Sequence, residues 1–104
     1  MARVVWTDEA RQRLDEIVAF VAQDSERNAL RLEKAIIEAS RRMETLPLGG
    51  GVVEELRKYG VREIYYGVYR ILYVVREDTC YIVCVIHGSR DLLRNVIPED
   101  WMDI

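Results

Sequence analysis

The sequence has few of the residues that mark specialised protein classes. Its 104 residues include two cysteines, two prolines, six glycines and one histidine. With so few chain-breaking residues and 50% hydrophobic residues, it has the composition of a folded domain and not of a disordered segment. The length suits one domain, so we predict a single domain over residues 1–104.

The two cysteines do not predict a disulfide bond or a metal site. Cys80 and Cys84 are four residues apart in a segment with the alternation of a strand. Four residues of a strand span roughly 13 Å, which is too far for a disulfide bond or for binding one shared metal ion. A single histidine adds no further zinc-binding pattern. We expect two reduced thiols, no metal and no cofactor.

Long apolar runs are absent. No stretch approaches the roughly 18 residues that a membrane-spanning helix needs. The first residues, MARVVWTDE, lack the apolar core of a secretory signal. We therefore expect a cytoplasmic protein with no contact with a membrane.

Lysine is scarce and the net charge is slightly negative. Lys34 and Lys58 are the only lysines among 15 basic residues, and 18 acidic residues give a net charge of −3. The chain therefore lacks the overall positive field that attracts nucleic acids. The charge is unevenly distributed, because residues 57–94 are basic and lie between an acidic first half and an acidic tail at about 95–104.

The first half of the sequence predicts a strand and then a helical hairpin. Residues 3–6 are β-branched and aromatic, as in a strand. Thr7 and Ser25 suit the N-cap position of two helices, because acidic residues follow each of them directly. The second helix should end before Pro47. The apolar stripes are Ala10, Leu14, Ile17, Val18 and Val21 in the first helix, and Ala29, Leu32, Ala35, Ile36, Ala39 and Met43 in the second.

The second half predicts an antiparallel β meander. We interpret glycines 49–51 as a flexible link, after which the apolar pattern becomes that of strands. Strands are expected near 61–66, 69–76 and 80–86, with a turn at 77–79. Both faces of the last two strands are largely apolar, so these should be central strands. In the last one, for example, Tyr81, Val83 and Val85 alternate with Cys80, Ile82, Cys84 and Ile86. The expected fold class is α+β with the order βααβββ.

One face of this sheet lacks an obvious cover. Two helices can cover only one face, so the other apolar face must be covered in one of two ways. Either the tail packs on it, or a partner chain covers it, because soluble monomers rarely expose large apolar patches. The second explanation predicts that the isolated chain self-associates or is poorly soluble. The apolar residues of the C-terminal segment are Leu92, Leu93, Val96, Ile97, Trp101 and Met102.

Four residues of the basic segment are candidates for catalysis or anion binding. His87 follows the last expected strand and precedes a glycine, a position suited to acid–base chemistry. Arg62, Arg70 and Arg90 could bind phosphates or carboxylates through two hydrogen bonds each. Each candidate also has a structural explanation. The histidine could fix the turn, and the arginines could pair with carboxylates.

Tyrosines are frequent in the same segment. Arginines and tyrosines that share a sheet can bind RNA through charge and base stacking. Tyrosine also favours strands simply because it packs well on a sheet. The tyrosines are Tyr59, Tyr65, Tyr66, Tyr69, Tyr73 and Tyr81.

Five short segments occur in an order shared with a known family. They are residues 6–10 (WTDEA), 53–57 (VEELR), 60–63 (GVRE), 69–73 (YRILY) and 85–91 (VIHGSRD). With the order strand, two helices and β meander, they resemble the RelE/ParE superfamily of toxins from type II toxin–antitoxin modules. The ParE branch is the most similar, and the resemblance extends over about residues 3–95.

The resemblance implies a toxin of a plasmid-stabilisation-type module, held inactive by a cognate ParD-like antitoxin. The implied target of the ParE branch is DNA gyrase, and that of the RelE branch is mRNA, cleaved on the ribosome. In the RelE alternative His87 would be the general acid or base, and Arg62, Arg70 and Arg90 would stabilise the transition state. A third alternative is an inactive homologue that only binds an antitoxin.

Two features depart from the RNA-cleaving members of this superfamily. No tyrosine follows Tyr81, so a C-terminal catalytic tyrosine is missing, and the net charge of −3 does not favour RNA. We therefore predict a gyrase inhibitor that does not bind nucleic acid directly. The basic segment 57–94 is expected to meet an acidic antitoxin segment that folds on the toxin and covers the open sheet face.

Overall fold

The computed structural model describes all residues, 1–104, and has the α+β architecture that the sequence predicts. It begins with strand β1 (Arg3–Trp6) and helices α1 (Asp8–Ala22) and α2 (Glu26–Ser40). The later strands and the last helix are β2 (Gly51–Val52), β3 (Val61–Tyr66), β4 (Tyr69–Arg76), β5 (Thr79–His87) and α3 (Leu92–Asn95). Three short 3-10 helices are η1 (Arg41–Glu44), η2 (Glu54–Tyr59) and η3 (Pro98–Trp101).

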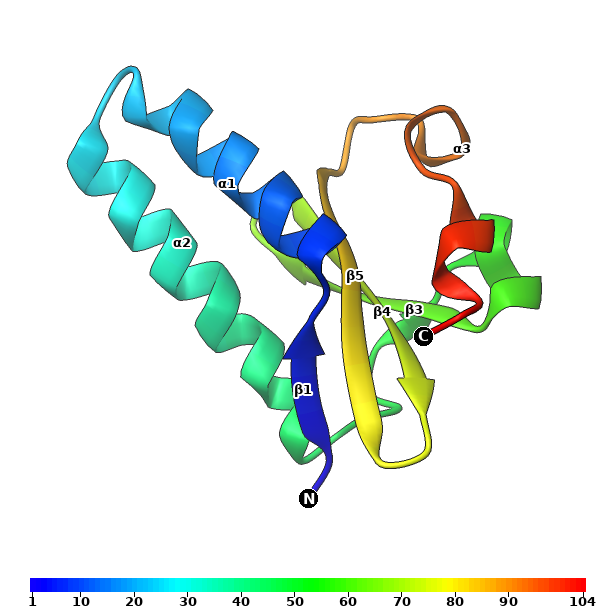
Figure 1. Ribbon diagram of the computed structural model, residues 1–104. Coiled ribbons are helices and arrows are strands. Elements are labelled where there is room, and N and C mark those ends of the chain that lie inside the picture. Colours follow the sequence, from blue (N-terminus) through cyan, green and yellow to red (C-terminus); the bar gives the residue numbers. More distant parts are fainter.

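The five strands form one sheet in the order β1-β5-β4-β3-β2. Strands β3, β4 and β5 make the expected antiparallel meander, and β1 pairs in parallel with β5. The two-residue strand β2 and the helix η2 were not expected from the sequence. In Figure 1 the α1–α2 hairpin lies on one side of the sheet, and α3 and the C-terminal end lie on the other.

Both helices start at the expected capping residues. The Thr7 hydroxyl oxygen accepts a hydrogen bond from the backbone N–H of Ala10 at 3.2 Å, and the Ser25 hydroxyl accepts one from Asn28 at 3.1 Å. The Thr7 hydroxyl also donates to the carbonyl of Ile82 at 2.8 Å, which ties the start of α1 to β5. The tip of the hairpin projects past the sheet, so the second half of the α1 stripe is only half-buried (Figure 1).

The helix side of the sheet holds the first of two buried clusters. This helix-side cluster joins residues of α1, α2 and η1 to the side chains of β3, β4 and β5 that face the helices. Its members are Ala10, Leu14, Ile36, Met43, Ile64, Ile71, Tyr73, Cys80, Ile82 and Val85.

The opposite face of the sheet is covered by the chain itself. Leu92, Val96 and Trp101 of the C-terminal segment are buried there together with Val53 and Leu56 around η2. Of the two explanations for this face, cover by the tail is correct, and the expectation that an antitoxin segment covers an open sheet face is wrong, because the tail and η2 already bury it. The other members of this tail-side cluster are Val61, Leu72, Val74, Val83, Cys84 and Ile86.

The glycine run at 49–51 is not a flexible link, because its central residue is buried. The N–H of Gly50 donates to the hydroxyl of Tyr73 at 2.9 Å. A Cβ on Gly50 would lie 2.6 Å from both this hydroxyl and the carbonyl oxygen of Glu63, so no larger side chain fits. The guanidinium of Arg62 donates to the carbonyls of Gly50 and Leu48 at 2.8 and 3.3 Å. These contacts fix the loop to the sheet.

Strand β5 contains a bulge that the sequence pattern did not reveal. The pairing of β4 with β5 shifts between Leu72 and Tyr73, which leaves Val83 without a partner residue. As a result Val83 and Cys84 both pack in the tail-side cluster, and Val85 packs in the helix-side cluster. The expected regular alternation of β5 is therefore wrong beyond Val83.

No helix of the structure is both long enough and apolar enough to cross a membrane. Both cysteines are free and buried.

Candidate functional site

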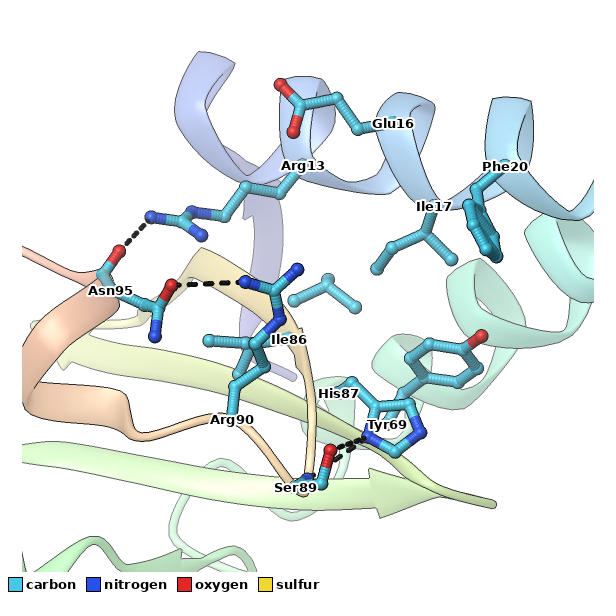
Figure 2. Close-up of a pocket in the computed structure, with 11 residues that line it drawn as sticks. Arg13, Glu16, Ile17, Phe20, Tyr69, Ile86, His87, Ser89, Arg90 and Asn95 are labelled. Carbon is cyan, nitrogen blue, oxygen red and sulfur yellow. Dashed lines mark hydrogen bonds between the residues drawn. The ribbon is translucent and has the colours of Figure 1, made fainter.

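A pocket of about 540 Å³ lies between α1 and the end of β5 (Figure 2). One wall comes from α1, and the other comes from the ends of β4 and β5, the turn that follows them and the end of α3. The α1 wall consists of Arg13, Glu16, Ile17 and Phe20, and the other wall consists of Tyr69, Val85, Ile86, His87, Ser89, Arg90 and Asn95.

The bulge in β5 decides that His87 faces this pocket. Because side chains alternate along a strand, His87 lies on the same side as Val85, which packs toward the helices. Without the bulge it would share the opposite face with Val83. Its cross-strand partner is Tyr69, and the two rings meet edge to face with centroids 5.7 Å apart.

The turn after β5 orients the imidazole ring. His87 Nδ1 accepts the backbone N–H of Ser89 at 3.1 Å and lies 2.8 Å from the Ser89 hydroxyl oxygen. A ring nitrogen that accepts an N–H carries no proton, so the neutral ring is protonated on Nε2. The residue is exposed, and Nε2–H remains free as a donor. His87 therefore makes the turn contact that its structural explanation expects and keeps a free polar edge.

Two arginines meet at one residue of the tail. Arg13 donates to the backbone carbonyl of Asn95 at 2.6 Å, and Arg90 donates to its side-chain oxygen at 3.4 Å (Figure 2). Arg13 also lies 3.4 Å from the carboxylate of Glu9. Sequence reasoning missed Arg13, because its contact with Asn95 joins residues 82 positions apart and leaves no local pattern.

The other two predicted site residues lie outside the pocket. Arg62 holds the loop before β2, as described above. Arg70 packs on the tail side of the sheet, where its Nε donates to the Glu63 carboxylate at 2.6 Å. Burial disfavours its charge, but the hydrogen bond and charge of Glu63 keep the pKa of Arg70 above its ordinary value. Of the four candidates, the structure brings only His87 and Arg90 together.

The sequence matches a protein family over most of its length. Residues 4–92 match the family described as the ParE toxin of the type II toxin–antitoxin system parDE. The chain belongs to the ParE toxin family. It is therefore a ParE-type toxin of a toxin–antitoxin system, which confirms the resemblance seen in the sequence. No curated protein matches it significantly.

Solved structures of the same fold include two toxin–antitoxin systems. A chain of the chromosomal ParDE system from P. aeruginosa has a TM-score of 0.73 and 22% identity, covering 86% of this chain and 98% of its own. A chain of a RelBE toxin–antitoxin complex from Mycobacterium tuberculosis has a TM-score of 0.59 and 25% identity, covering 83% and 96%. These similarities confirm the fold that the ParE family match implies.

Proposed function

We propose that this ParE-type toxin inhibits DNA gyrase in the cytoplasm and is neutralised by a cognate ParD-like antitoxin. The observation that carries the proposal is the family match over residues 4–92. The similarity to chains of the P. aeruginosa ParDE system and of a RelBE toxin–antitoxin complex supports an antitoxin partner.

Two features favour gyrase over mRNA as the target. Arg70 is buried and paired with the Glu63 carboxylate, and Arg62 uses part of its guanidinium to hold the carbonyls of Leu48 and Gly50, so both arginines have structural roles. The net charge of −3 also provides no long-range attraction for RNA.

The second candidate function is ribosome-dependent mRNA cleavage, as in the RelE branch. It is favoured by one observation, the shared pocket in which exposed His87 and Arg90 lie together. In this alternative His87 would transfer a proton and Arg90 would stabilise developing charge. An inactive homologue that only binds an antitoxin is the third possibility.

Induction of the chain in growing cells separates these functions. Gyrase inhibition predicts loss of negative plasmid supercoiling and filamentous, DNA-damaged cells, with translation continuing at first. Translation arrest with cut transcripts and normal supercoiling would instead establish mRNA cleavage. Unchanged growth, with the toxin detected by immunoblot, would establish the inactive homologue.

Neutralisation is tested by expressing the adjacent reading frame together with the toxin. A cognate antitoxin should restore growth and copurify with the toxin. A neighbouring protein that neither binds the toxin nor restores growth would contradict this part of the proposal.

A further inference from the structure

We propose that the pocket between α1 and β5 binds a carboxylate joined to an apolar group, presented by a peptide segment of a protein partner. This inference goes beyond the proposed function, because it concerns the chemistry that the pocket recognises, whichever enzyme the toxin inhibits.

One part of the pocket is basic and carries free hydrogen-bond donors. Arg90 is exposed and has no carboxylate within ion-pair distance, although it touches the amide oxygen of Asn95 at 3.4 Å. The Nε2–H of His87 is free as well, because Nδ1 is occupied by Ser89. The contact with Asn95 limits the directions that the Arg90 guanidinium can take. A carboxylate between Arg90 and His87 would gain charge-assisted hydrogen bonds from both.

Another part of the pocket is apolar and open to solvent. The Phe20 side chain is 70% exposed although it stands on the pocket side of α1. Ile17 is half-buried one turn before it, and the ring of Tyr69 forms the opposite wall (Figure 2). An apolar group placed between these three side chains would remove their exposed surface from water. The ligand therefore needs an apolar part beside its charge.

The surrounding charges favour one carboxylate over a polyanion. Glu16 lines the same pocket, and no positively charged side chain lies within ion-pair distance of it. Arg13 lines the pocket too, but it pairs with Glu9 at 3.4 Å and donates to the carbonyl of Asn95, so Arg90 is the pocket arginine without a carboxylate partner. One unpaired arginine can bind one carboxylate, and the negative charge of Glu16 disfavours a ligand that brings further anionic groups. The protein as a whole carries a net charge of −3, which also disfavours a chain of phosphates. A peptide with adjacent apolar and acidic residues can bind both the basic and the apolar part of the pocket, whereas the phosphates of an RNA strand can bind only the basic part.

The direct test is an NMR titration of the full chain with two blocked tetrapeptides, acetyl-Gly-Phe-Glu-Gly-amide and its Gln counterpart. The Glu peptide should bind with a Kd of about 1 mM and shift the amide signals of Phe20, His87 and Ser89. The Gln peptide should bind about tenfold more weakly, because it lacks the charge.

Matched variants locate the binding. Arg90→Gln should weaken the affinity for the Glu peptide about tenfold. Arg94 is an exposed arginine four residues further along the chain, and Arg94→Gln should leave this affinity unchanged. Phe20→Ser should weaken the affinity for both peptides. Leu30→Ser, which alters another exposed apolar side chain, should leave both affinities unchanged. All four side chains are exposed, so each variant is expected to keep the fold, which the NMR spectrum itself reports.

Three results would overturn the proposal. The first is equal binding of the Glu and Gln peptides, and the second is no shift at these residues up to about 10 mM peptide, which is about ten times the expected Kd. The third is hexauridylate that binds in the pocket more tightly than the Glu peptide, which would identify an RNA site instead. None of these results depends on gyrase, so this inference and the proposed target can fail separately.

Discussion

Truncation of Trp101 tests the conclusion that the tail covers the second face of the sheet. The side chain is only 2% exposed and packs in the tail-side cluster, and its Nε1–H donates to the Glu9 carboxylate at 3.1 Å. Replacing such a residue by alanine removes its burial and leaves a cavity, which costs about 3–5 kcal/mol. Domains of this size have free energies of unfolding of about 5–15 kcal/mol. Trp101→Ala should therefore remove about a fifth or more of the free energy of unfolding.

Two further variants separate packing from the hydrogen bond. Trp101→Phe keeps most of the apolar contact and loses the bond to Glu9, so it should cost about 1–2 kcal/mol. Met102→Ala changes the adjacent side chain, which is 62% exposed, and should stay within about 0.5 kcal/mol of the natural protein. Urea unfolding followed by far-UV circular dichroism measures all three. A loss below about 1 kcal/mol for Trp101→Ala would refute the packing of the tail on the sheet.

Three other predictions concern the buried hydroxyl, the β4–β5 turn and the thiols. Tyr73→Phe leaves the buried N–H of Gly50 without a partner and should lower the free energy of unfolding in urea by about 1–3 kcal/mol. The first turn residues of the two hairpins, Gly67 and Glu77, both have φ of 56°, so Glu77→Gly should raise the melting temperature by relieving about 1 kcal/mol of strain, and an unchanged or lower value would contradict this. Burial raises the pKa of Cys84 to about 11, so at pH 8 a thiol reagent should label it only after unfolding, and fast labelling of the native protein would show that it is accessible.

Local patterns in the sequence predicted much of the fold correctly. The caps at Thr7 and Ser25 and the helical spacing after them depend on residues close in sequence, and both helices start where expected. The three strands of the meander were also correct to within a residue or two at each end. These features have local causes, so the sequence alone contains them.

The errors arose where distant residues meet. The burial of Gly50 depends on Tyr73, 23 residues later in the chain, and nothing near the glycine run indicates it. The bulge at Val83 lies in a segment apolar on both faces, where a shift of one residue leaves the apolar pattern unchanged. That same shift decides which side of the sheet His87 faces, so this part of the site could not be predicted.

The tail shows the same limit. The sequence identifies its apolar residues as one possible cover for the sheet, and in the structure they pack on that face. The contact of Asn95 with Arg13, which closes one end of the pocket, follows from this docking and leaves no trace in the local sequence. Arg70 pairs with Glu63, which agrees with the structural explanation that the sequence offered beside its possible role in a site.

The most direct test of the proposed function is a supercoiling assay with purified components. The toxin is added to DNA gyrase, ATP and relaxed plasmid, with and without its antitoxin. We predict that the toxin blocks supercoiling and that the antitoxin restores it. Full supercoiling at a large excess of folded toxin, together with mRNA cleavage in a ribosome assay, would contradict gyrase as the target.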